Sequence, residues 1–306
     1  MQKTLKSDVV FTGVGLHEGR DVTLRVRPAA AETGIWFRRM DIADRDGFIS
    51  ANWRFSVHTA LCTRLVNAEG VRVSTVEHVM AALAGCGVSN AILELDGPEI
   101  PIMDGSALDF VRGFLNVGLI NQLKSVRALE ILKPVEVHEN GAYAALFPFS
   151  GMEMDFSIDF PDSAIGQQSK SINLANGSFV HELCDSRTFC RQSDVALMQS
   201  NGLALGGTLL NAVVVDGAEV LSPGGMRHAD EPVRHKMLDA MGDLALAGGP
   251  IIGRYVGRRA GHTVTNKLLR KLFKQASNFQ MVECDPEVSQ RLPGAGLVQQ
   301  DTRIFV

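Results

Sequence analysis

Residues 233–243 read Val-Arg-His-Lys-Met-Leu-Asp-Ala-Met-Gly-Asp and carry the pattern around which the chain is organised. His235 and Asp239 are four residues apart, so on a helix their side chains lie on one face, close enough to bind one metal ion. Asp243 continues this polar face. A second, apolar face predicts contact with a hydrophobic core and comprises Val233, Met237, Ala240, Met241 and Leu244. An isolated His-x-x-x-Asp is more often a solvated ion pair, so other parts of the chain must decide.

The ends of two helices can be predicted from local signals. Asp230 is placed to cap the helix just described, and Gly248-Gly249-Pro250 ends it. A second helix is predicted over residues 74–85, which open with a Ser-x-x-Glu capping-box pattern and close on glycine. His78 lies in its first turn. The capping box also explains Glu77 as a helix cap without any catalytic role.

The composition excludes several classes of protein. The chain has 306 residues, of which 45% are hydrophobic and 21% charged, as expected for a soluble globular protein of about two domains. A net charge of −4 argues against nucleic-acid binding. No signal peptide and no membrane-spanning apolar run is present, so we expect a cytoplasmic protein. The five cysteines form no C-x-x-C pair, so a metal would be held by histidines and carboxylates.

The order of predicted elements repeats along the chain. Strands are predicted in the first half at 2–11, 21–27, 34–39 and 88–95, with helices at 74–85 and 107–116. Strands are predicted in the second half at 126–138, 142–148, 152–160 and 251–256, with helices at 232–248 and 261–274. We therefore predict an α+β fold of two duplicated domains, 1–123 and 124–306. Their helices face each other in a β-α-α-β sandwich.

This duplication brings His78 and His235 together, because each lies near the start of the equivalent helix. A site at the domain interface would then combine His78 with His235 and Asp239. Two histidines and one aspartate leave a fourth tetrahedral position open, which is typical of a catalytic rather than a structural zinc site.

Several sequence blocks, in order and correctly spaced, resemble one known family. They are residues 75–85, 98–106, 187–189, 233–243 and 260–262. The family is the UDP-3-O-acyl-N-acetylglucosamine deacetylase of lipid A synthesis, and the match extends to about Leu272. The resemblance implies a zinc amidase that removes acetate from a UDP-sugar carrying a 3-O-hydroxyacyl chain. It also implies one small insertion in each domain. We expect a monomer with one zinc ion per chain.

The resemblance assigns roles to individual residues. The zinc ligands it implies are His78, His235 and Asp239. Glu77 matches the general base and His262 the general acid, whose imidazole is hydrogen-bonded by Asp243. The hydroxyl of Thr188 matches the group that stabilises the developing oxyanion.

The resemblance also implies contacts to the substrate, from Lys236, Phe160, Phe189 and Arg259. Lys236 follows His235 directly, so its side chain is expected on another side of the helix. Arg259 and its neighbour Arg258 supply positive charge for a diphosphate, and Phe160 a flat ring for uracil. The leucine-rich segment 193–220 resembles the insertion that shields the acyl chain from water.

Two alternatives from other classes stay open. A zinc peptidase is disfavoured, because no H-E-x-x-H motif is present. A non-catalytic carrier of sugar lipids would use the same apolar segment but would not require Glu77 or His262.

Overall fold

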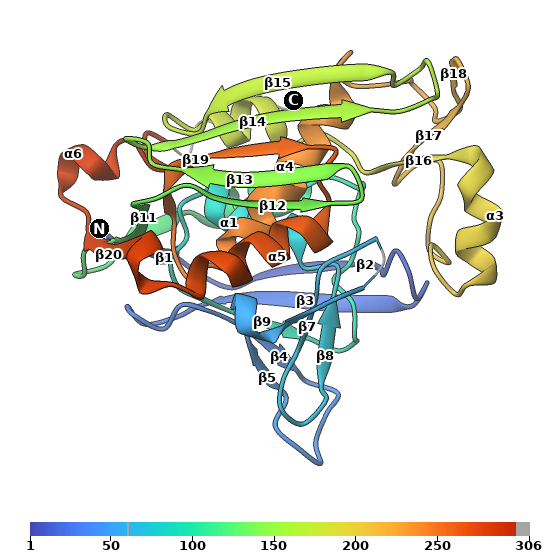
Figure 1. The fold of residues 1–306 in the computed structure, drawn as a ribbon. Coiled ribbons are helices and arrows are strands. Elements are labelled where there is room, and N and C mark those ends of the chain that lie inside the picture. Colours follow the sequence, from blue (N-terminus) through green and yellow to red (C-terminus); the bar gives the residue numbers. More distant parts are fainter. Residues whose placement is uncertain (60, 298–306) are drawn as a thin grey trace.

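The computed structural model describes residues 1–59 and 61–297, which form two large sheets with helices between them (Figure 1). The first sheet has the strand order β2-β3-β9-β4-β5, and all neighbours are antiparallel except β4 and β9. Its strands are β2 (Val9–Val14), β3 (Asp21–Pro28), β4 (Ile35–Arg39), β5 (Phe48–Ser50) and β9 (Ala91–Leu95). Along β3, Val22, Leu24 and Val26 are buried and alternate with more exposed residues, as expected when one face of a sheet is covered.

The second sheet is built from the second half of the chain. Its order is β12-β13-β19-β11-β20, and β14 pairs with both β19 and β15. Its strands are β11 (Arg127–Ile131), β12 (Val135–Glu139), β13 (Ala142–Phe147), β14 (Met152–Asp159), β15 (Gln167–Asn173), β19 (Ile251–Arg258) and β20 (Phe279–Glu283). The predicted domain boundary after residue 123 lies between the strands of the two sheets and stays a prediction. Residues 298–306, which the prediction assigns to the second domain, lie outside the described residues.

One predicted strand, 126–138, is wrong as a single element. It is divided into β11, which pairs with β19 and β20, and β12, which pairs with β13. Pro134 lies between the two strands, and proline has no N–H to donate to a central ladder. The backbone N–H groups of Leu132 and Lys133 donate instead to the carbonyl of Asn278.

The helices form the middle layers, so the predicted β-α-α-β sandwich is confirmed (Figure 1). The helices are α1 (Glu77–Gly85), α2 (Leu108–Val117), α4 (Glu231–Ala245) and α5 (His262–Phe273). The apolar face predicted for α4 is buried in one hydrophobic core that also includes residues of α1 and of both sheets. The core therefore holds α1 and α4 against each other, which places the polar face of α4 inside the molecule.

Helix α1 begins later than predicted. Thr75 has a φ of 58°, in the left-handed region, so the chain turns sharply before the helix begins at Glu77. The hydroxyl of Ser74 accepts a hydrogen bond from Arg64 Nε at 2.8 Å and caps nothing. The capping box is therefore absent, and the side chain of Glu77 is free for other contacts.

Helix α4 also differs from prediction at its ends. Asp230 precedes the helix but forms no side-chain capping bond, because its carboxylate pairs with Arg234 one turn later. The helix ends at Ala245, before the predicted stop at 248–250. These differences leave His235, Asp239 and Asp243 on three successive turns of one helix, as predicted.

Two insertions project from the sandwich. The first contains β6 (Ser56–Val57), β7 (Arg64–Val66) and β8 (Arg72–Ser74), and the second contains β16 (Phe189–Arg191), α3 (Gln192–Ser200), β17 (Val213–Asp216) and β18 (Glu219–Val220). Helix α3 extends away from the sheets (Figure 1). The loop after it returns to the first half of the chain, where the N–H groups of Leu205 and Gly206 donate to the carbonyls of His17 and Leu16. The acyl-chain insertion predicted at 193–220 thus contacts both halves of the chain.

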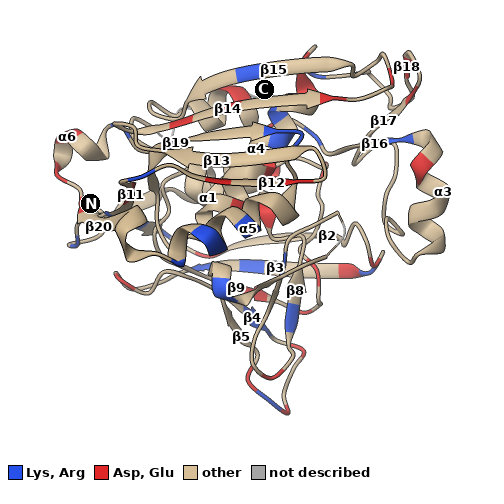
Figure 2. Ribbon diagram, viewed as in Figure 1, with Lys and Arg blue, Asp and Glu red and all other residues tan. Residues whose placement is uncertain are grey.

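The remaining elements are short and lie outside the two large sheets. Strand β1 (Lys3–Leu5) pairs with β10 (Leu119–Asn121), and α6 (Pro286–Ser289) follows the last strand. Short helical turns occupy Trp53–Phe55, Phe179–Leu183 and Ala276–Asn278. None of the helices in the described part of the chain has the length and hydropathy needed to span a bilayer. Positive and negative residues are interspersed over both sheets, and charged residues also occur on the interior helix α4 (Figure 2).

Candidate active site

The site depends on a very close crossing of α1 and α4. A Cβ atom built on Gly242 would lie 2.0 Å from the carbonyl oxygen of Glu77, closer than any side chain allows. Glycine at this position therefore lets the two backbones touch. As a result, the side chains of the first turn of α1 lie directly against the polar face of α4.

Three side chains converge at this crossing: His78 from α1, and His235 and Asp239 from α4. All three are buried, and their ligand-capable atoms lie within 4.8 Å of one another. Asp239 Oδ1 is 3.3 Å from His235 Nε2 and 3.5 Å from His78 Nε2. It has no hydrogen-bond partner among the described residues. Buried carboxylate oxygens are normally paired, so these residues form a cluster that could hold a metal ion.

The orientation of His235 strengthens this interpretation. Its Nδ1 lies 3.0 Å from the carbonyl oxygen of Ser186, which can only accept, so Nδ1 carries the proton and Nε2 presents a lone pair. Burial lowers the pKa of His235 to about 4, although Asp239 opposes this shift, so the ring is neutral at pH 7. Nε2 therefore points a lone pair toward a carboxylate oxygen. A cation between the two atoms relieves that repulsion, so the donor set fits a metal.

Lys236 is closer to this cluster than predicted. Its Nζ lies 2.8 Å from Asp239 Oδ2, so the expectation that it leaves on another side of the helix is wrong. The long side chain reaches back to the residue one turn later, and its charge stabilises the buried carboxylate.

The carboxylate of Glu77 lies beside the cluster. Its Oε2 accepts a hydrogen bond from the backbone N–H of Thr63 at 3.0 Å, and its Oε1 is 3.6 Å from His262 Nε2. Burial raises the pKa of Glu77 to about 7, although His262 and His78 act in the opposite direction. A carboxylate whose pKa lies near neutrality can accept and release a proton at the working pH. Its explanation as a mere helix cap is wrong.

His262 begins α5 and faces Glu77 from the other side. Its Nδ1 lies 2.9 Å from Asp243 Oδ2, so the predicted hydrogen bond is present, and the hydroxyl of Thr63 donates to Asp243 Oδ1. Burial alone would lower the pKa of His262. The carboxylates of Asp243, Glu77 and Asp239 outweigh burial and raise this pKa to about 9. At pH 7 the ring is an imidazolium that can donate a proton from Nε2.

Two of the predicted substrate-binding residues line the same region. The ring of Phe189 lies 6.2 Å from that of His235, measured between centroids, and the ring of Phe160 packs on Phe189 at 5.3 Å. Thr188 precedes Phe189, is half-buried, and donates its backbone N–H to the carbonyl of Gly105 at 2.7 Å. The Arg-Thr-Phe block is thus anchored to the loop before α2, beside the cluster.

The two arginines before α5 lie apart from the cluster. Arg259 is exposed, and the guanidinium of Arg258 lies over the ring of Tyr143, 5.5 Å from its centroid. Among the contacts of the described residues, neither guanidinium reaches the histidines. A role for Arg259 with a diphosphate therefore stays a prediction.

Two residues that hydrogen-bond side chains of the site were not predicted from the sequence. Thr63 is 1% exposed and binds both Glu77 and Asp243, which are 14 and 180 residues away in the chain. Ser186 orients His235 through a carbonyl that any residue could supply. Neither contact has a local sequence signal, although Ser186 directly precedes the Arg-Thr-Phe block.

Comparison with known proteins decides the family. A family model described as UDP-3-O-acyl N-acetylglycosamine deacetylase matches residues 2–274. The chain belongs to this family. The UDP-3-O-acyl-N-acetylglucosamine deacetylase of Shewanella frigidimarina is 44% identical over 300 residues, which cover 96% of this chain and 98% of the relative. The deacetylases of that name from Pasteurella multocida (45% over 286 residues, 93% of each chain) and Haemophilus influenzae (44% over 283 residues, 92% of each) are similarly close.

The geometry brings a proton acceptor and a proton donor together beside the cluster. Glu77 can accept a proton and His262 can donate one, and the two groups are 3.6 Å apart at their nearest polar atoms. Both lie next to a cluster that could hold a metal ion. Such an arrangement can move protons onto and off a bound amide without exchange with bulk water.

Proposed function

We propose that this protein is a zinc-dependent deacetylase that hydrolyses the acetamide of UDP-3-O-(3-hydroxyacyl)-N-acetylglucosamine in lipid A synthesis. Membership of the family supports the reaction and the substrate. The observation that carries the proposal is the unpartnered oxygen of Asp239 facing the lone pair of His235, with a proton acceptor and a proton donor beside it.

His78, His235 and Asp239 would hold one zinc ion per chain. Three protein ligands of this kind are typical of catalytic zinc sites, whereas magnesium and calcium take oxygen ligands. A bound zinc ion polarises the amide carbonyl and lowers the pKa of water. In this proposal Lys236 offsets the negative charge of Asp239 and extends toward the substrate.

Glu77 acts as the general base in the proposed reaction. It takes a proton from water as the water oxygen forms a bond with the amide carbon. The N–H of Thr63 holds Oε2, so Oε1 is left to accept the proton. The hydroxyl of Thr188 donates to the carbonyl oxygen as negative charge develops there.

His262 acts as the general acid. As the C–N bond breaks, the electron pair of that bond remains on nitrogen, which takes the proton from His262 Nε2. The products are acetate and the free amine of the sugar. Asp243 accepts from Nδ1 and keeps the ring protonated until this step.

We assign the substrate contacts to Lys236, Phe189, Phe160 and Arg259, and the acyl chain to segment 193–220. Leu197 and Leu210 in that segment are 66% and 74% exposed, and exposed apolar side chains of this size commonly mark a binding site. Each buried methylene contributes about 0.8 kcal/mol, so a long acyl chain supplies much of the binding energy. We retain the division into domains 1–123 and 124–306, with the site between them.

We further propose that the enzyme works as a monomer in the cytoplasm. The site described here uses residues of one chain alone, and UDP-sugars are intracellular metabolites.

The decisive test combines metal analysis with acetate release. The purified protein should contain about one zinc per chain and release acetate from the UDP-linked 3-O-acyl sugar in a chelator-sensitive way. Asp239→Ala should lose zinc and activity but keep its circular dichroism spectrum. Zinc-loaded wild-type protein that binds the substrate without releasing acetate would instead support a carrier.

A further inference from the structure

A buried ion pair links the start of α4 to the segment before β16. Glu231 is 0% exposed and Arg187 is 6% exposed. Glu231 Oε1 accepts from the backbone N–H of Arg187 at 3.0 Å and from its Nε at 2.9 Å. Oε2 accepts from Arg187 Nη2 at 3.1 Å and from the backbone N–H of Arg227 at 2.6 Å. All four hydrogen bonds end on one carboxylate.

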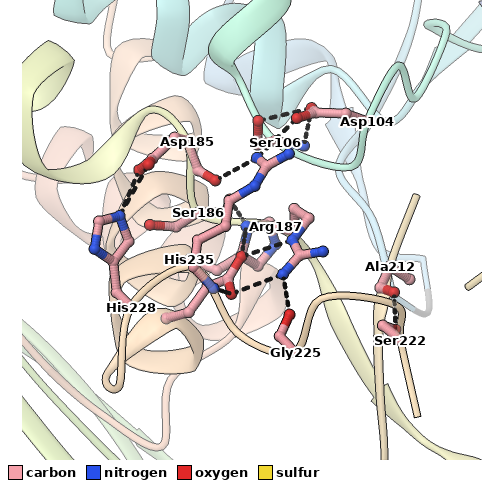
Figure 3. Close-up of polar contacts among 12 residues, drawn as sticks. Asp104, Ser106, Asp185, Ser186, Arg187, Ala212, Ser222, Gly225, His228 and His235 are labelled. Carbon is pink, nitrogen blue, oxygen red and sulfur yellow. Dashed lines mark hydrogen bonds and ion pairs between the residues drawn. The ribbon is translucent and has the colours of Figure 1, made fainter. Parts of the chain in front are cut away.

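The residues on either side of Arg187 both serve the site. Ser186 offers its carbonyl to His235 Nδ1 (Figure 3). Thr188 donates its backbone N–H to the carbonyl of Gly105. Strand β16 begins at the next residue, Phe189. The tripeptide 186–188 therefore orients a candidate metal ligand, carries the candidate oxyanion donor and directly precedes the insertion.

The hydrogen bonds around Glu231 continue through Arg227 into the first half of the chain. Arg227 Nη1 lies 2.8 Å from Asp104 Oδ2 and donates to the carbonyl of Asp185 at 2.7 Å. The two acceptor residues, Asp104 and Asp185, are labelled in Figure 3. Asp104 in turn accepts from the hydroxyl and the N–H of Ser106. The carboxylate of Glu231 thus lies at the centre of contacts between the two layers.

We propose that Glu231 is a positioning residue for the reaction, because it fixes residues 186–188 so that His235 faces the metal cluster and Thr188 faces the substrate. This inference rests on the proposed function. It assigns Glu231 no contact with substrate or metal. Partners that orient a metal-binding histidine typically change metal affinity when they are altered.

A carboxylate is required here, because only a carboxylate presents acceptors to all four donors. The amide of glutamine has one oxygen and one NH₂ group, so two of the four N–H groups would meet a donor. Glu231→Gln therefore keeps the size of the side chain and disrupts the anchor. Arg187→Lys is milder, since the backbone N–H of residue 187 can still reach Glu231.

The chain offers a matched control in Asp162. Its carboxylate is 8% exposed, pairs with Arg191 and accepts the backbone N–H of Gly217 at 3.0 Å. It is thus also a buried carboxylate that joins an arginine and a backbone N–H, but it holds no neighbour of His235. Asp162→Asn should lower the thermal midpoint without changing zinc affinity.

The experiment measures three quantities on the full chain: the zinc dissociation constant by competition with a chelator, kcat and KM at saturating zinc, and the thermal midpoint of the metal-free protein. Glu231→Gln should raise the zinc dissociation constant about 10-fold and lower kcat with KM within about twofold of wild type. Arg187→Lys should act in the same direction, less strongly. Arg187→Lys decides the question if Glu231→Gln fails to fold.

The double variant Arg187→Met/Glu231→Leu separates positioning from stability. Replacing a buried ion pair with apolar side chains often restores stability, but here it still removes the acceptor from two backbone N–H groups. We expect its thermal midpoint to lie above that of Glu231→Gln, because no charge is left unpaired, while zinc binding remains weak. Zinc affinity that recovers together with stability overturns the inference, as does wild-type affinity in Glu231→Gln. A wild type without zinc binding or acetate release would refute the proposed function instead.

Discussion

Two buried glutamates occupy the same position in the two central helices, yet they differ in their electrostatics. Glu77 is the first residue of α1 and Glu231 the first residue of α4, and they are 2% and 0% exposed. Burial raises the pKa of Glu77 to about 7, because Glu77 accepts only one backbone N–H and the histidines beside it, which act in the opposite direction, do not outweigh burial. Burial acts on Glu231 in the same direction, but Arg187 and two backbone N–H groups outweigh it and lower its pKa.

The difference shows that the supply of donors, not depth of burial, decides what a buried carboxylate can do. With four N–H donors, Glu231 stays ionised and acts as a fixed anchor. With one N–H donor, Glu77 can gain and lose a proton near pH 7. The first residues of α1 and α4 are thus one glutamate that can exchange a proton near pH 7 and one glutamate that stays ionised.

The largest expected effects on activity and stability come from replacing Glu77 and Glu231 in turn by glutamine. Glu77→Gln should lower kcat/KM by about 10²- to 10⁴-fold, because it removes the proton acceptor. At pH 8 its metal-free form should be at least as stable as wild type, since the raised pKa means that the ionised carboxylate is disfavoured in the fold. Glu231→Gln should lower the free energy of unfolding by about 3 kcal/mol, because it leaves Arg187 unpaired.

Urea denaturation of the metal-free proteins measures the free energy of unfolding, and acetate release measures kcat/KM. A similar loss of unfolding free energy in the two variants would contradict the difference between the two glutamates. Wild-type activity in Glu77→Gln would contradict the role of Glu77 as proton acceptor.

The next effect concerns the crossing that brings Glu77 to α4. Gly242→Ala places a Cβ where the carbonyl oxygen of Glu77 lies, so the helices must separate. A displacement of about 1 Å can lower activity about 10²-fold, and we expect that loss together with reduced stability. Gly113→Ala on α2 is the control, since its Cβ would meet the ring of Phe11 and no residue of the crossing between α1 and α4. Equal activity losses per folded molecule in both variants would contradict the prediction.

Much of this arrangement could be predicted from the sequence because it is periodic. The i, i+4 spacing of His235 and Asp239 and the apolar face of α4 depend only on helical geometry. The sandwich and the convergence with His78 followed from the repeated order of elements. These features need no knowledge of side-chain contacts between distant segments.

The rest depends on single backbone angles and long-range contacts. Ser74 and Glu77 form a capping-box pattern, but the left-handed Thr75 separates them, and no local propensity predicts that angle for threonine. The partners of Thr63 and Arg187 are far away in the chain, and each contact uses a backbone group. Such contacts arise only when the layers are packed, so pattern alone does not indicate them.

Thr63 allows the hydrogen bond to Asp243 to be tested separately from the one to Glu77, because it contacts Glu77 through its backbone N–H and Asp243 through its hydroxyl. Thr63→Val keeps the N–H bond to Glu77 and removes the bond to Asp243. We expect kcat/KM at pH 7 to fall about 10-fold, as for a lost orienting partner, and Thr63→Ser to restore most of it. Thr265→Val is the control, since Thr265 is equally buried but its hydroxyl bonds Tyr255 and the carbonyl of Gly261 and no carboxylate. If both valine variants lose the same activity, the hydroxyl of Thr63 has no orienting role.

The smallest expected effect at pH 7 is that of Asp243→Asn. In the proposed reaction Glu77 must be ionised and His262 protonated, so kcat/KM should be bell-shaped in pH, with an acid limb from Glu77 and an alkaline limb from His262. A bound cation lowers the pKa of both Glu77 and His262. The positions of the limbs are therefore compared between variants, and not with the pKa values of about 7 for Glu77 and about 9 for His262. Asp243 is the carboxylate that raises the pKa of His262 most, and removing its charge lowers that pKa. The alkaline limb should therefore move down by roughly one pH unit, with activity at pH 7 reduced only about threefold, while the acid limb moves little. Full pH profiles of wild type and Asp243→Asn test this, and an alkaline limb that does not move would mean that a group other than His262 protonates the amine.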